Sequence, residues 1–360
     1  MHSDLLTLSE LSLTAGKTGH LQGIAADPKT GDIFWSFTTL LIKTDSKGNI
    51  LGSVTGLIGH LGCIAFSAER GELWGSLELK DDSIGRGILK MLGREERVTN
   101  AFYAVVFDSE KISNENMVAV GDGVMLACHL PEVTEDYLAR LPDGNLHRHG
   151  GSGIDGITFA PKICEEPSAP TRLYVAYGIY GDTERSDNDD QVILSIDPDK
   201  ALENAHPLRQ SAPHTTGVKC EEKLFLRTGN TEYGIQNLEY DCFTDQFFAA
   251  VYPGKKPEFS NPTMFVFPRK QSPELIIDNQ KRLIAPCKEF CFPLGSTGLY
   301  TLENGEFLVS ECFDANGADA AKINRRRFTG QGREGFERVW KSPVCFAPET
   351  RWLPSAQAGE

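Results

Sequence analysis

The amino-acid sequence predicts an all-β protein that forms a single β-propeller over residues 1–360. Three observations predict this fold: 35 glycines are spread along the chain, short β-rich runs lie between them, and a two-strand unit recurs. Each copy has a short apolar strand, a tight polar turn and a second strand of alternating polarity, which is the pattern of a β-hairpin. Short antiparallel strands that repeat in this way are typical of propeller blades.

Five copies of the unit are clear, and their inner strands are expected to begin near residues 22, 62, 155, 236 and 297. The interval between 62 and 155 is long enough for another blade, and Asp122-Gly123-Val124-Met125 echoes Asp155-Gly156-Ile157-Thr158. We therefore expect six blades, with five as the alternative. The apolar run at residues 5–13 is expected to supply an outer strand that closes the ring with the last blade and removes its open edge.

Charge and composition exclude several classes of protein. The 36 Lys and Arg residues against 50 Asp and Glu residues give a net charge of -14, which argues against a nucleic-acid partner. No apolar run approaches the ~18 residues of a membrane span, and the N-terminus lacks the pattern of a secretion signal. The nine cysteines are scattered, as in a reduced compartment. We expect a cytoplasmic protein with a small-molecule substrate and no membrane partner.

Residues 20–36 read HLQGIAADPKTGDIFWS, and weaker echoes of this unit cover most of the chain. The unit resembles the six-bladed propellers of the NHL, gluconolactonase and strictosidine-synthase-like group. This resemblance implies six blades but does not choose between an enzyme and a binding scaffold, because one fold hosts both. Gluconolactonase-like members are expected to carry an early Glu on the first inner strand as a metal ligand. Here that neighbourhood has His20 and Gln22, so the resemblance does not carry over their calcium site.

Polar side chains recur where the inner strands begin, around the expected central channel. The copies align on one apolar residue in each inner strand, which we call the anchor. Two residues before the anchors stand Gln22, Gly62, Asp155, Gln236 and Thr297. Four residues before two of the anchors stand His20 and His60, and offsets of two and four share one face of a strand. The ends of the second strands add further residues to this face: Thr38, Thr39, Glu78, Lys80, Tyr177, Tyr180, Tyr252 and Glu311.

Two imidazoles, a carboxylate and amides at one channel mouth indicate either a divalent-metal site or an acid/base pair. We expect the metal ligands or acid/base catalysts to be His20, His60 and Asp155, with further catalytic candidates in Tyr177, Tyr252 and Glu311. The residues expected to bind substrate are Gln22, Gln236, Asn237, Thr297 and Glu78. The alternative is that these groups only satisfy one another and the backbone around the channel.

The sequence thus predicts an enzyme that acts on a small polar metabolite such as a sugar acid, a lactone or a glycoside. The reaction would be hydrolysis or β-elimination, assisted by histidine or by a divalent cation. The alternative is a propeller that binds a partner without catalysis. Three segments rich in Gly, Pro and charge (residues 81–100, 181–190 and 253–262) are expected to form loops that shape the substrate site.

Overall fold

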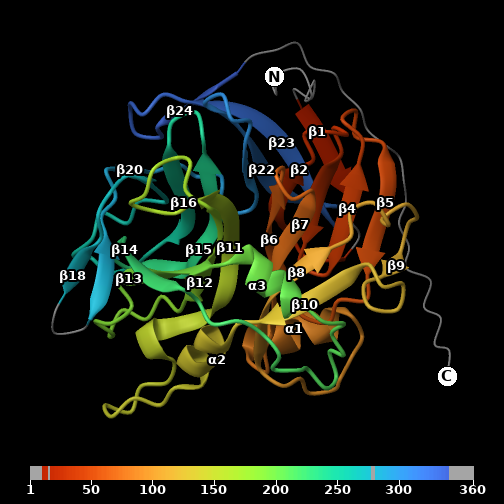
Figure 1. Ribbon diagram of the computed structural model, residues 1–360, viewed down its shortest axis with the longest axis horizontal. Coiled ribbons are helices and arrows are strands. Elements are labelled where there is room, and N and C mark those ends of the chain that lie inside the picture. Colours follow the sequence, from red (N-terminus) through yellow and green to blue (C-terminus); the bar gives the residue numbers. More distant parts are fainter. Residues whose placement is uncertain (1–9, 15–16, 277–279, 340–360) are drawn as a thin grey trace.

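The computed structural model describes residues 10–14, 17–276 and 280–339, and its strands form five sheets around a common centre (Figure 1). The inner strands of the sheets are β2 (Leu21–Ala26), β6 (His60–Ser67), β11 (Gly151–Pro161), β15 (Thr231–Asp241) and β21 (Leu299–Thr301). Each inner strand contacts the next in this order, and β21 contacts β2 again. The fold is therefore a single closed β-propeller of five blades, and the five inner-strand starts expected from the sequence are confirmed.

Each blade continues outward from its inner strand. Blade 1 adds β3 (Ile33–Phe37), β4 (Leu40–Thr44), β5 (Ile50–Thr55) and β9 (Met117–Val118). Blade 2 adds β7 (Glu72–Leu79), β8 (Ala101–Phe107) and β10 (Met125–His129). Blade 3 adds β12 (Thr171–Ile179), β13 (Asp190–Ile196), β14 (Glu222–Arg227), β19 (Lys281–Ile284) and β18 (Glu274–Ile276). Blade 4 adds β16 (Gln246–Pro253), β17 (Met264–Pro268) and β20 (Lys288–Phe290).

Blade 5 adds β22 (Glu306–Ala315), β23 (Ala318–Phe328) and β1 (Glu10–Thr14), and β24 (Phe336–Arg338) also pairs with β23. The pairing of β1 with β23 is antiparallel and lies on the outer side of the blade. Of the run at residues 5–13 that was expected to close the ring, residues 5–9 lie outside the described residues. Closure by this N-terminal segment stays a prediction.

The prediction of six blades is wrong. Between β6 and β11 the chain forms the rest of blade 2, the strand β9 of blade 1 and two inserted helices, α1 (Ser83–Met91) and α2 (Pro131–Leu138). Asp122, which was aligned with a sixth inner strand, lies in a turn and accepts a hydrogen bond from the Val118 amide at 2.6 Å. The residues that follow it lead into the outer strand β10. A polar turn before an apolar strand has the same local pattern at the outer and inner edges of a blade.

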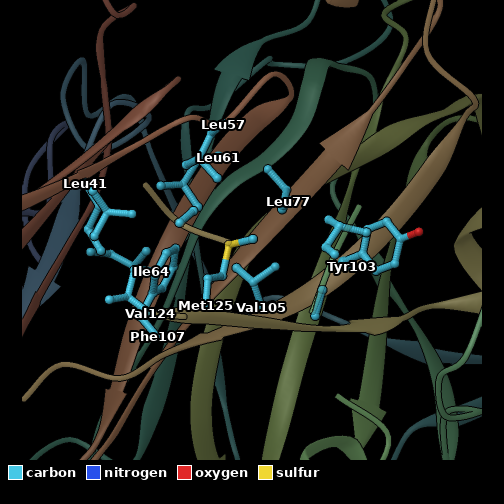
Figure 2. Close-up of a cluster of buried hydrophobic side chains, with 14 of the residues drawn as sticks. Leu41, Leu57, Leu61, Ile64, Leu77, Tyr103, Val105, Phe107, Val124 and Met125 are labelled. Carbon is cyan, nitrogen blue, oxygen red and sulfur yellow. The ribbon is translucent and has the colours of Figure 1, made fainter. Parts of the chain in front are cut away.

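One hydrophobic core fills each interface between neighbouring blades. Figure 2 shows the core between blades 1 and 2, where Leu41 of β4 lies in one cluster with Ile64 of β6 and Val105 of β8. The other four interfaces have cores of the same kind. A fully buried apolar side chain stabilises the fold by about 1.5–3 kcal/mol. These five cores, together with the inner-strand contacts, hold the ring closed.

Helix α1 occupies part of a segment that was expected to be a loop. Its signal in the sequence is an apolar stripe of Ile84, Ile88 and Met91 at helical spacing, which two glycines obscure because each lowers helix propensity by about 1 kcal/mol. A side chain at Gly85 would collide with the Lys80 carbonyl oxygen, so glycine lets the helix begin close to the end of β7. In the described ranges the other helices are α3 (Pro198–Glu203) and the 3-10 turn η1 (Arg148–Gly150).

None of the helices in residues 10–14, 17–276 and 280–339 combines the length and the apolar character that crossing a bilayer requires.

We expect Asp82→Ala to lower the free energy of unfolding by about 1 kcal/mol, because Asp82 is the N-cap of α1. Its Oδ1 accepts a hydrogen bond from the Gly85 amide at 2.8 Å. Chemical denaturation measures the loss. Asp82→Asn is the matched variant, since asparagine also caps helices, and an equal loss in both variants would contradict a capping role.

Candidate active site at the channel mouth

A pocket of about 360 Å³ lies at the starts of the inner strands of blades 1 to 4. Pockets that bind small molecules have volumes of ~300–1,000 Å³, so this one suits a compact ligand. Seven residues that were expected to form the site line it: His20, Gln22, His60, Glu78, Asp155, Gln236 and Tyr252. The register of inner strands around a propeller thus brings together residues that are far apart in the sequence.

At the centre of the pocket, His60 of β6 faces Asp155 of β11, with 3.3 Å between His60 Nδ1 and Asp155 Oδ1. Both atoms are buried, and neither has a hydrogen-bond partner among the described residues. Burial, followed by the nearby Lys80 ammonium, lowers the pKa of His60 to about 3. Burial, followed by the charge of Glu78, raises the pKa of Asp155 well above its usual range. Both shifts favour the uncharged forms, a neutral imidazole and a protonated carboxyl group.

A buried ion pair lies beside these two groups. Lys80 Nζ is 2.5 Å from Glu78 Oε1 and donates a hydrogen bond to the Ser152 carbonyl oxygen at 2.8 Å. Glu78 Oε2 accepts a hydrogen bond from the Ile154 amide at 3.0 Å. Burial by itself would lower the pKa of Lys80, but the charges of Glu78 and Asp82 more than offset this effect and raise it. The pair ties the end of β7 to the start of β11 and keeps Lys80 charged.

Two glutamines hold the polar wall of the pocket. Gln236 Nε2 donates to Asp155 Oδ2 at 2.9 Å and to the Tyr233 carbonyl oxygen at 2.8 Å, which fixes the Asp155 carboxyl group. Gln22 Nε2 donates to Thr38 Oγ1 at 3.1 Å. His20 lines the pocket on the side of blade 1.

The remaining lining of the pocket is largely apolar and aromatic. Helix α1 contributes Ile84, Ile88 and Met91. Tyr233 and Tyr252 of blade 4 meet edge to face with their ring centroids 5.8 Å apart. Burial raises the pKa of Tyr252 to about 12, so its hydroxyl group stays protonated at neutral pH. Its hydroxyl group also interacts with the side chain of Ser296.

Four residues that were expected at the site do not line this pocket. The Tyr177 hydroxyl donates to Asp136 Oδ2 at 3.2 Å within the core between blades 2 and 3. Asn237 Oδ1 accepts from the Leu299 amide at 3.3 Å, and Thr297 Oγ1 accepts from the Ser310 hydroxyl at 3.2 Å. Glu311 lines a separate pocket of about 320 Å³ on blade 5. Tyr177 and Glu311 lie on the second strands β12 and β22, and no residue of blade 5 is among the residues that line the channel-mouth pocket.

The geometry gives no support to a metal at His20, His60 and Asp155. In the part of the chain that the structure describes, no group of three or more His, Cys, Asp and Glu side chains is arranged to hold a metal ion. The Lys80 ammonium already provides the positive charge next to Glu78. The residues at the channel mouth therefore do not fit a divalent cation.

Sequence reasoning assigned no role to Lys80, Tyr233 or the apolar face of α1. Lys80 stood among the second-strand ends, but its partner Ser152 comes from another blade and has no sequence signal. Tyr233 sits in a β-bulge of β15 with a φ of 61°, which interrupts strand alternation. For these residues the sequence offered one usable signal, the helical spacing of the apolar residues on α1.

No protein-family model and no curated protein matches the chain. Among solved structures it is similar to a gluconolactonase from Xanthomonas campestris, with 11% identity, a TM-score of 0.38, and 90% of this chain and 83% of that one covered. It is also similar to the soluble aldose sugar dehydrogenase from Escherichia coli (10% identity, TM-score 0.36, 88% and 99% covered). A third similar structure is the β-propeller domain of Cps50 (Swd1) from Myceliophteria thermophila (10% identity, TM-score 0.32, 87% and 99% covered).

Proposed function

We propose that this protein is an enzyme that hydrolyses a carbon–oxygen bond in a small polar metabolite, such as a lactone or a glycoside, by proton transfer at the channel mouth. One observation carries the proposal: His60 Nδ1 and Asp155 Oδ1 are buried, 3.3 Å apart, and without hydrogen-bond partners in the described residues. Buried polar atoms without partners are rare in folded proteins. Two such atoms at one pocket are suited to meeting the oxygens of a ligand.

Asp155 acts as the general acid in this proposal. Burial raises its pKa and so favours the protonated carboxyl group, which in that form donates a proton to the leaving oxygen as the carbon–oxygen bond breaks. His60 Nδ1 accepts a hydrogen bond from the attacking water and takes its proton once the water oxygen has bonded to carbon. The resulting imidazolium then returns a proton to the Asp155 carboxylate across the 3.3 Å separation, which restores both groups.

The low pKa of His60 favours hydrolysis over β-elimination. Elimination requires a base that removes a proton from carbon, and an imidazole with a pKa of about 3 is too weak for that step. A water that has already bonded to the substrate is a far stronger acid than a carbon-bound hydrogen. The same weak base is therefore adequate for hydrolysis.

The proposal is tested by turnover of neutral lactones and of nitrophenyl glycosides by the full chain. We expect His60→Asn to lower kcat/KM by at least about 100-fold, since general acid–base catalysis contributes about 10²–10⁴-fold. Glu289→Gln is the control, because Glu289 is exposed on β20 away from the pocket. If these compounds bind at the pocket but none is turned over, the protein is a binding propeller and the enzymatic proposal is wrong.

A further inference from the structure

The pocket joins two surfaces of different character. Its lining includes the polar groups of His60, Asp155 and Gln236 as well as the apolar side chains of Ile88 and Met91 of α1. Helix α1 is an insertion between β7 and β8. Its apolar stripe begins at Ile84, two residues after the N-cap that fixes the helix to the end of β7. The helix therefore adds apolar side chains to the lining of the same pocket that holds the polar groups.

The charges at the pocket are already balanced. The lining residues all lie in the described part of the chain. Among them Lys80 is the only residue with a cationic side chain of the lysine or arginine type. Its ammonium group is 2.5 Å from Glu78 Oε1 and 3.8 Å from Asp82 Oδ2. An anionic ligand would lose its hydration shell and find no unpaired cation, while two carboxyl groups, Glu78 and Asp155, face it. The pocket is suited to an uncharged ligand.

We propose that the substrate is an uncharged amphiphile, with an oxygen-rich head at His60 and Asp155 and an apolar group of a few carbon atoms against Ile88 and Met91 of α1. This inference rests on the proposed function for the identity of the head, and it excludes free sugar acids. Tyr233 and Tyr252 form the wall next to the head, where a ring of the ligand can lie against their edge-to-face pair. An alkyl lactone or a glycoside with a short apolar aglycone fits this description.

Binding of two homologous series to the full chain tests the inference without requiring turnover. The probes are γ-lactones with side chains from methyl to hexyl and n-alkyl β-glucosides from methyl to hexyl, with Kd measured by calorimetry. Burial of a methylene group is worth about a fourfold gain in affinity, so we expect Kd to fall by about that factor for each carbon until the wall is covered. Gluconate should bind at least about tenfold more weakly than gluconolactone, because it carries an unpaired charge.

Met91→Gln keeps the length of the side chain and the helix propensity, and it should flatten the dependence of Kd on chain length. Lys90→Gln is the matched control on the exposed face of α1 and should leave the dependence unchanged. Affinity that does not rise with chain length in either series, or gluconate that binds more tightly than the lactone, overturns the inference. Such a result together with His60-dependent turnover leaves the proposed function intact. Chain-length dependence without any turnover supports the amphiphile site and rejects the enzymatic proposal.

Discussion

Asp155→Asn is expected to lower kcat/KM by about 10²–10⁴-fold, which is the contribution that a positioned general acid makes. Asparagine keeps the size of the side chain and can keep the hydrogen bond from Gln236, which joins Asp155 Oδ2 at 2.9 Å. It cannot donate a proton to a leaving oxygen. The loss should therefore appear in kcat, with little change in the affinity for substrate.

The pH dependence of the same variant separates proton donation from positioning. Under the proposed function the general acid Asp155 acts only while protonated, so kcat/KM should fall as the pH rises through its pKa, which burial and then Glu78 raise well above the usual range. His60, with a pKa of about 3, stays neutral over the same range and adds no acidic limb above about pH 4. The residual activity of Asp155→Asn should lack the alkaline fall. If the activity of the variant still falls at alkaline pH, the fall is caused by the titration of another group.

The Asp155 substitution should not unfold the protein. Because the folded-state pKa of Asp155 lies above its unfolded value, the folded protein holds this proton more tightly, and that contribution to stability is lost as the pH rises through the folded-state pKa. Asparagine has no proton to lose. Above that pH the variant should be as stable as the wild-type protein or more so, and thermal unfolding at two pH values checks this expectation.

The fold and much of the site could be predicted because the same two-strand unit repeats in every blade. Gln22 and Asp155 stand at equivalent positions of their copies, two residues before Ile24 and Ile157, and both lie at β-bulges of their inner strands. The bulges separate the two pocket residues from the buried face of Ile24 and Ile157, which strand alternation alone did not predict. Equivalent positions in different blades meet at the channel, so the repeats align residues that are far apart in sequence. His60 and Asp155 reach the same pocket for this reason.

The number of blades could not be predicted from the same pattern. Blade 2 and its inserted helices occupy the length in which a sixth blade was expected, and Asp122 repeats only the turn that precedes a strand. Tyr177 and Tyr252 stand at similar positions on second strands, but Asp136 of α2 accepts a hydrogen bond from Tyr177 within the core. Helix α2, which supplies this partner, was not predicted because its sequence carries only weak signals of a helix. Whether a tyrosine at this position lines the pocket or enters the core therefore depends on tertiary contacts.

Lys80→Met is expected to lower the free energy of unfolding by about 3–5 kcal/mol, which is the usual cost of breaking a buried ion pair on one side. Lys80 is 4% exposed and Glu78 is 3% exposed, so the Glu78 carboxylate would remain buried with the Ile154 amide as its hydrogen-bond donor. Burial raises the pKa of Glu78 even with Lys80 present. Without the ammonium group that pKa should rise further.

The double variant Glu78→Gln/Lys80→Met identifies the cause of the loss. Replacing both members of a buried pair by neutral groups is often neutral or stabilising, so most of the lost stability should return. The matched surface control is Lys111→Met, since Lys111 pairs with Asp108 at 2.7 Å while 59% exposed, and exposed pairs contribute about 0–1 kcal/mol. Urea unfolding with an unchanged m-value makes the free energies comparable.

The loss in Lys80→Met should also depend on pH, in a direction that follows from Glu78. The folded-state pKa of Glu78 lies above the unfolded value, so the cost of burying the carboxylate grows as the pH rises and disappears when the group is protonated. The variant should therefore be closer to the wild-type protein at pH 5 than at pH 8. A loss that is the same at both pH values, and that persists in the double variant, would show that the bond from Lys80 to the Ser152 carbonyl oxygen stabilises the channel mouth rather than the charge pair.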